Sequence, residues 1–175
     1  MIEAGKGFWA AALEQYQEKY SGGTLTPEKV REVEAELGYR LPAGYIAISE
    51  IQNGGFPVNI CYPTDQQNNW ADDHVAIVGI FGIGRENQWT LCGELGSQFW
   101  VDEWDYPEIG VYFADCPTAG HQMVALDYRE CGPQGEPKVV YVDQEDDYSI
   151  IELAPDFMTF ITGLLPEEHF EADDG

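Results

Sequence analysis

The sequence predicts an α+β domain: helices come first, a central and mostly antiparallel sheet of about six strands follows, and one helix closes the chain. Two observations lead to this fold class. Apolar residues near the start recur with the period of a helix, and from residue 58 onward short β-branched and aromatic segments alternate with turn residues. Helices that precede a run of strands are typical of α+β proteins. The 175 residues, 44% of them hydrophobic, suit one domain with a full core.

The first helix is expected within residues 1–24. Trp9, Leu13, Tyr16 and Tyr20 recur at i, i+4, i+7 and i+11, which predicts that their side chains share one buried helical face. A Ser-Gly-Gly segment directly after Tyr20 then predicts the end of this helix.

Two further helices are expected before residue 55. Thr26-Pro27 predicts the start of one, because Thr is a favoured N-cap and Pro fits the first helical position. The other follows Leu41-Pro42 and stops at Asn53-Gly54-Gly55, where Gly accepts the left-handed conformation of a helix end. The residues predicted to be buried are Val30, Val33 and Leu37 in the one helix and Tyr45, Ile48 and Ile51 in the other.

The remaining elements follow from residue 58 onward. A short helix is expected over Ser97–Trp104, and Asp156 is a good N-cap for the closing helix, which breaks at Pro166. Residues 131–135 favour a turn, so the strands on either side of them are expected to pair as an antiparallel hairpin. The predicted strands are Val58–Tyr62, Val75–Phe81, Ile109–Phe113, Met123–Tyr128, Lys138–Val142 and Ser149–Leu153.

The charge balance is the most unusual property of the composition. Thirty-two Asp and Glu stand against eight Lys and Arg, so the formal net charge is −24. The excess is concentrated in the second part, since residues 1–100 hold 13 acids and 6 bases, whereas residues 101–175 hold 19 acids and 2 bases. Repulsion disfavours direct binding to nucleic acid or to anionic membranes and favours a cationic protein partner. The alternative is that the acidity serves only solubility.

The sequence offers little to hold a metal ion. Its three histidines are widely spaced, and neither HExxH nor CxxC occurs. Asp143, Glu145 and Asp147 alternate like the start of a calcium loop, but Tyr148 stands where the sharp turn of that loop needs Gly. We therefore expect no specific metal site.

Cofactor and nucleophile motifs are equally weak. Gly79, Gly82 and Gly84 are spaced like part of a phosphate-binding loop, but no P-loop Lys follows, so these glycines indicate a bulge or a close approach of two strands. Cys116 lies five residues before His121, but the segment between them is typical of a loop that enters a strand, and Cys is a common core residue. We expect no cofactor and no catalytic activity.

The chain is expected to be cytoplasmic. Met1–Leu13 carries an acid and lacks the apolar run and cleavage site of a signal peptide. The longest uncharged apolar stretch, Val75–Gly84, is too short to span a bilayer.

One stretch, residues 99–108, combines aromatic and acidic residues and is the best candidate for an interaction surface. Its other interpretation is core tryptophan flanked by solvated acids, with at least one of Trp100 and Trp104 in the core. A second acidic run lies at residues 143–147 and adds to that surface if the fold brings the two together. The residues expected to bind a partner are Trp100, Asp102, Glu103, Trp104, Asp105 and Glu108, followed by Glu145, Asp146 and Asp147.

An ordered set of short motifs runs through the chain and resembles the SUKH superfamily, the Smi/Knr-type domain of bacterial toxin-immunity proteins and fungal cell-wall regulators. The resemblance covers residues 25–165 within a single domain of residues 1–175, with an N-terminal helix over residues 1–24 and an acidic tail over residues 166–175. The motifs are Leu25-Thr26-Pro27, Glu34, Leu37-Gly38, Leu41-Pro42, Tyr45, Asn53-Gly54-Gly55, Gly120-His121, Gly135-Glu136-Pro137, Val139-Val140-Tyr141 and Leu153-Ala154 with Phe157, Phe160 and Ile161.

The resemblance implies a fold with a central sheet and no catalytic residues, in which the matching positions build the fold. It also implies an immunity protein that binds and neutralises a cognate toxin, and the acidity favours a cationic toxin such as a nuclease. The alternative is a regulatory scaffold that recruits cellular proteins, as the fungal members suggest.

Overall fold

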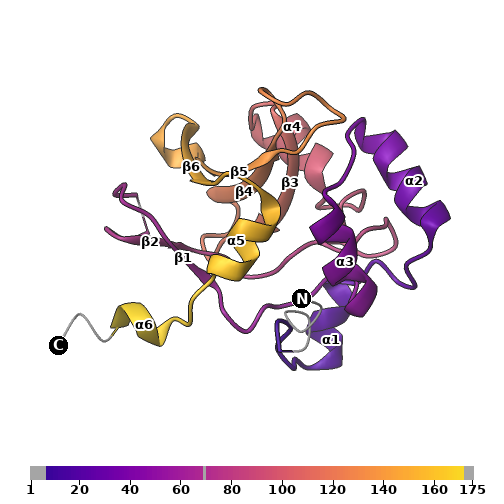
Figure 1. Ribbon diagram of the computed structural model, residues 1–175, viewed down its shortest axis with the longest axis horizontal. Helices are drawn as coiled ribbons and strands as arrows, with labels where there is room; N and C mark the ends of the chain where they lie inside the picture. The colour runs from indigo at the N-terminus through magenta and orange to yellow at the C-terminus, as the bar shows by residue number, and fades with distance from the viewer. Residues whose placement is uncertain (1–6, 69, 172–175) are drawn as a thin grey trace.

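The computed structural model describes residues 7–68 and 70–171 and combines helices with two antiparallel sheets (Figure 1). The α+β class, the N-terminal helices and the closing C-terminal helix are confirmed. The helical elements are α1 (Glu14–Gln17), the 3-10 turn η2 (Glu18–Tyr20), α2 (Pro27–Leu37), α3 (Ala43–Ile51), α4 (Ser97–Trp104), the 3-10 turn η3 (Gln144–Asp146), α5 (Phe157–Gly163) and α6 (Glu168–Glu171). The strands are β1 (Cys61–Pro63), β2 (His74–Ala76), β3 (Gly110–Asp115), β4 (Gln122–Asp127), β5 (Lys138–Asp143) and β6 (Ser149–Ala154). In Figure 1, α1, α2 and α3 lie together on the side away from β6.

The six strands form a four-stranded sheet and a two-stranded sheet instead of one sheet of six. The larger sheet has the order β3-β4-β5-β6, and β1 pairs with β2 in the smaller one. The predicted strand Val75–Phe81 is too long, because β2 ends at Ala76 and the chain then meets its neighbours through isolated bridges such as Ile80 with Ala114. Glycines in this stretch favour such local contacts over a regular ladder.

The first three strands of the larger sheet are buried on both faces. Every residue of β3 and β4 is buried, and so is β5 after its first residue. Successive strand residues point to opposite faces. Phe113 therefore packs against Phe157 of α5, with ring centroids 5.5 Å apart, while Tyr112 packs against Tyr106, with centroids 5.2 Å apart, on the face that α4 covers.

The prediction of a long first helix is wrong. Regular helix covers only Glu14–Gln17 before η2, and the side chains of Leu13 and Tyr16 are 66% and 50% exposed. The preceding segment is extended, because Trp9 bridges Pro57 and the Ala10 N–H donates to Phe56 O at 2.7 Å. Tertiary pairing therefore overrides the helical pattern of the sequence.

The second and third helices are confirmed, and α2 begins as predicted with a Thr26 N-cap. In α3 Tyr45 and Ile48 are buried as expected, but Ile51, the last residue of the helix, is 48% exposed. The closing helix has Asp156 as its N-cap, and its Oδ1 accepts from the Thr159 N–H at 2.8 Å.

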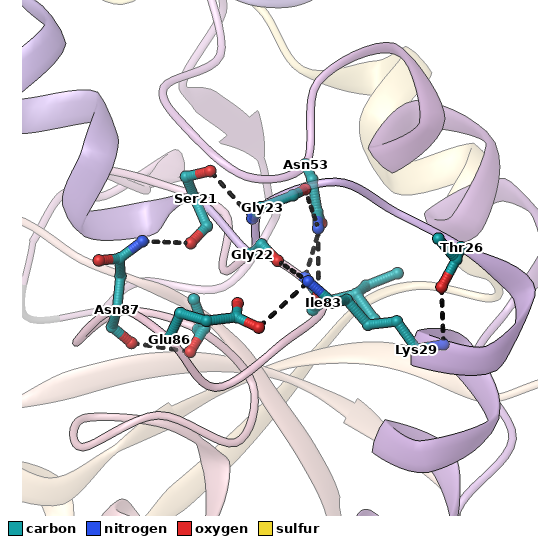
Figure 2. A network of polar contacts seen from close by, with 10 residues as sticks. Ser21, Gly22, Gly23, Thr26, Lys29, Asn53, Ile83, Glu86 and Asn87 are labelled. Carbon is teal, nitrogen blue, oxygen red and sulfur yellow. Dashed lines mark hydrogen bonds and ion pairs between the residues drawn. The ribbon is translucent and has the colours of Figure 1, made fainter.

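A polar network, buried at Asn53 and Ile83, joins the helical half of the chain to the segment that precedes the larger sheet (Figure 2). The Asn53 side chain donates to Gly23 O at 3.1 Å and to Ile83 O at 3.0 Å and accepts from the Ile83 N–H at 2.7 Å. Lys29 Nζ donates to Gly22 O at 2.6 Å and pairs with Glu86 at 3.2 Å. Asn53, which the sequence motif singles out, therefore connects three separate segments.

The predicted close approach at the glycine-rich segment occurs at Gly82. A Cβ atom at this position would lie 2.5 Å from Tyr20 O and 2.6 Å from Asn53 O, so only Gly fits. The Gly82 N–H donates to Tyr20 O at 2.9 Å. Three backbone segments thus meet with no room for side chains between them.

Candidate partner-binding face

Helix α4 presents the first group of predicted partner-binding residues. Asp102 and Glu103 are exposed and Trp104 is half-buried, whereas Asp105, also exposed, ends the helix in the left-handed conformation with φ 60°. This C-cap turns the chain back toward the sheet and leaves the carboxylates of the last helical turn in solvent.

The structure corrects the prediction that Trp100 contacts a partner. Its side chain is 3% exposed, and its indole N–H donates to Leu95 O at 3.0 Å. A Cβ on Gly120 would lie 2.7 Å from the Trp100 ring, so the loop before β4 closes directly over it. Trp100 is a core residue that holds α4 on the sheet, which is the other interpretation that the sequence allowed for one of its two tryptophans.

The turn η3 presents the second group. The Asp143 carboxylate is buried, and its Oδ1 accepts from the Glu145 N–H at 3.0 Å and from Gln122 Nε2 at 2.8 Å. This N-cap shapes the turn so that Glu145, Asp146 and Asp147 are all exposed.

Contacts between the two groups bring them together. The Tyr148 hydroxyl donates to Trp104 O, at the end of α4. The Trp104 and His121 rings pack nearly perpendicular to each other with centroids 5.6 Å apart, and His121 Nδ1 lies 3.3 Å from Glu145 Oε1. We call the resulting surface the acidic face; it consists of Asp102, Glu103, Trp104, Asp105, His121, Glu145, Asp146 and Asp147.

Glu108 does not belong to the acidic face. It lies near Tyr39, whose pKa is raised by burial and by the charge of Glu108. Tyr39 packs on Tyr128, with ring centroids 4.5 Å apart, just beyond the end of β4 that is opposite His121. The predicted site is therefore divided between the two ends of the sheet.

The ion pairs of the described residues leave the acidic face without Lys or Arg partners. Among these ion pairs, the one that involves the acidic face joins His121 to Glu145. The Lys and Arg ion pairs lie on α2, on the loop at residue 85 or toward the opposite end of the larger sheet: Lys29–Glu86, Arg31–Glu28, Arg85–Glu36, Arg129–Asp127, Lys138–Glu130 and Lys138–Glu152. The carboxylates of the acidic face are thus free to attract an external cation.

The sequence did not predict the positions of two residues in this part of the molecule, His121 and Asp115. His121 contacts both acidic segments. Its place between them depends on its contact with Trp104, which lies 17 positions earlier in the chain, so no local pattern reveals it. Asp115, at the end of β3, is buried under a hydrogen bond of 2.9 Å from the Tyr20 hydroxyl, and desolvation raises its pKa to about 7.

Cys116 lies next to Asp115 and is also buried. Desolvation, followed by the negative charges of Asp115 and Asp143, raises the pKa of its thiol, which disfavours the nucleophilic thiolate form. The interpretation of Cys116 as a core residue therefore fits its surroundings.

In residues 7–68 and 70–171, no three His, Cys, Asp or Glu side chains are grouped closely enough to hold a metal ion. The same part of the chain contains no helix with the length and apolarity that crossing a bilayer requires.

The fold and the motifs define the class to which this chain belongs. The profile of the SMI1 / KNR4 family (SUKH-1) matches residues 24–163, so the chain is a member of this family. Comparisons with curated proteins and with solved structures give no match.

Proposed function

We propose that this protein is a non-catalytic immunity protein of the cytoplasm that binds and neutralises a cognate cationic toxin, with a nuclease as the expected toxin class. The observation that carries the proposal is the acidic face, where two segments distant in sequence unite their carboxylates without a Lys or Arg partner among the described residues. Membership of the SUKH-1 family supports an immunity role.

The negative charge of the acidic face suits inhibition of a nuclease, because its carboxylates can compete with nucleic acid for the nuclease's binding groove. A groove that binds phosphates is lined with Lys and Arg, and a rigid array of carboxylates can occupy it in place of the nucleic acid. Half-buried Trp104 adds an aromatic anchor among the charges. Association is then fast at low salt and weakens as salt screens the charges.

The test begins with identification of the partner by pull-down at low and high salt, with any toxin domain encoded next to this gene co-expressed. Binding is then compared between two triple variants. The test variant is Asp102→Lys, Glu103→Lys and Asp146→Lys on the acidic face. The control variant reverses three exposed acids of α1, η2 and α3, namely Glu14→Lys, Glu18→Lys and Glu50→Lys.

Both variants have the same formal net charge of −18, because each reversal adds two positive charges to the −24 of the protein. The proposal expects the test variant to bind about 100-fold or more weakly than the control, chiefly through slower association. Equal affinities of the two variants would exclude the acidic face as the binding site. Many weak partners in place of one basic partner would contradict the immunity role and favour a scaffold.

A further inference from the structure

The larger sheet has one covered edge and one open edge. On the β3 side, the Val78 N–H donates to Asp115 O at 2.7 Å and the Phe81 N–H to Phe113 O at 2.8 Å, so the segment after β2 covers that edge. On the other side, β6 pairs with β5, and no other backbone partner of β6 occurs among the described residues. In Figure 1, β6 forms the border of the sheet farthest from α2 and α3.

The open edge is interrupted by a register shift opposite Val139 and Val140, but the first four residues of β6 pair regularly with β5. A strand presents half of its N–H and C=O groups to each side, so the outward half of β6 has no ladder to join. Protected edges commonly carry Lys or Pro, and Ser149–Ala154 contains neither. Ile150 and Leu153 are half-buried, which adds apolar contact area along the strand.

The surroundings of β6 determine which segment can add to it. The strand begins two residues after Asp147, so Asp146 and Asp147 of the acidic face lie close to its start. Glu152 lies within it and shares Lys138 with Glu130, at 2.8 and 2.7 Å. A groove of about 260 Å³, lined by Asp143, Asp146, Ser149, Ile151, Gln67 and Asn68, runs beside the first half of the strand.

We propose that β6 binds an extended, basic segment of a protein partner, which adds to the larger sheet as a fifth strand. Its backbone would pair with the outward groups of β6, while its Lys or Arg side chains would reach the carboxylates at Asp146 and Asp147. A second copy of this chain is a poor occupant, because each copy carries a net charge of −24. The inference rests on the proposed function and names the way in which the cationic partner is held.

The test uses a defined probe, an eight-residue peptide of alternating Lys and Val with blocked ends. Its control is the same peptide with alternate backbone amides N-methylated, which keeps the charge but removes the N–H donors on one side. Amide hydrogen exchange of the full chain, with and without each peptide, locates the binding. We expect slower exchange at alternate residues of β6, and affinity for the methylated peptide lower by roughly tenfold or more.

Other outcomes separate this inference from the proposed function. If both peptides bind equally and exchange slows only at α4 and η3, strand addition is wrong although the acidic face still attracts cations. If neither peptide binds, the inference is wrong, whereas the proposed function is judged by the two triple variants. A dimer of the free chain in sedimentation, with slow exchange at the outward amides of β6, would overturn the inference in favour of a second copy.

Discussion

Asp115 is a carboxylic acid in the core of an otherwise strongly ionised protein. It is 7% exposed, and its carboxylate accepts hydrogen bonds from the Tyr20 hydroxyl and from the Gly79 N–H at 3.2 Å. These bonds favour the ionised form, but desolvation outweighs them and raises the pKa from 3.8 to about 7. At neutral pH this one side chain is therefore close to its titration midpoint.

This raised pKa predicts an unusual dependence of stability on pH. Because the folded state holds the proton of Asp115 more tightly than the unfolded chain, the contribution of Asp115 to the free energy of unfolding is full below pH 3.8. It is lost as the pH rises toward 7, by at most about 1.4 kcal/mol per pH unit. Urea unfolding of the wild type and of Asp115→Asn between pH 4.5 and 7.5 measures this: the difference between the two curves must change with pH. Parallel curves would contradict the raised pKa.

Asn53 gives a second prediction at the scale of one residue. Asn53→Ala removes three hydrogen bonds and leaves the buried N–H and C=O groups of Ile83 without this partner, so we expect a loss of about 3 kcal/mol in the free energy of unfolding. Asn87→Ala is the matched control, since the Asn87 side chain donates one bond, to Ser21 O at 2.8 Å, and should cost about 1 kcal/mol. Chemical denaturation measures both, and similar losses would refute the central role of Asn53.

Gly82 is required because neighbouring backbone atoms lie too close for a side chain, and not because its backbone adopts a left-handed conformation. In Gly82→Ala the new methyl group meets backbone atoms of Tyr20 and Asn53, which cannot move without opening the core, so we expect a loss of about 3 kcal/mol or more. Gly132→Ala is the contrasting case: φ is +80° with no atom within 4 Å of the added Cβ, and the expected cost is about 1 kcal/mol. Thermal unfolding of the two variants distinguishes steric from torsional cost, and the reverse order of stabilities would contradict this reading.

Elements with a strong local pattern could be predicted, and elements fixed by distant contacts could not. The β4, β5 and β6 strands begin and end within one residue of their predicted bounds, because β-branched runs and turn residues delimit them. The first helix failed because Trp9 pairs with Pro57, which lies 48 positions later, a contact that no local pattern contains.

The candidate site shows the same division. The sequence pattern selected acidic and aromatic residues as two groups, but it could not determine which of the two tryptophans is buried. It also joined Glu108 to Asp105 by proximity in the chain, although the segment between them runs along the sheet: the Tyr106 hydroxyl donates to Gly120 O at one end, and the Tyr112 hydroxyl to Pro107 O toward the other.

At the scale of the whole molecule, the net charge of −24 acts against the compact state, because like charges are closer together in the folded chain. Salt screens this repulsion, so we expect the melting temperature to rise between 20 and 500 mM NaCl. The rise should be smaller in either triple variant, whose net charge is reduced. Calorimetry at neutral pH measures it, and a melting temperature that falls with NaCl would show that the ion pairs outweigh the repulsion.

The position of Trp104 has a spectroscopic consequence. Its indole ring is half-buried against His121 amid exposed carboxylates, so a protein that docks there replaces water around the ring with apolar and cationic groups. The fluorescence emission of Trp104 should then shift to shorter wavelength on binding. The emission of Trp100, which is already buried away from water, should stay unchanged. A Trp104→Phe variant would isolate the signal, and the protein would carry its own optical reporter of complex formation without any attached dye.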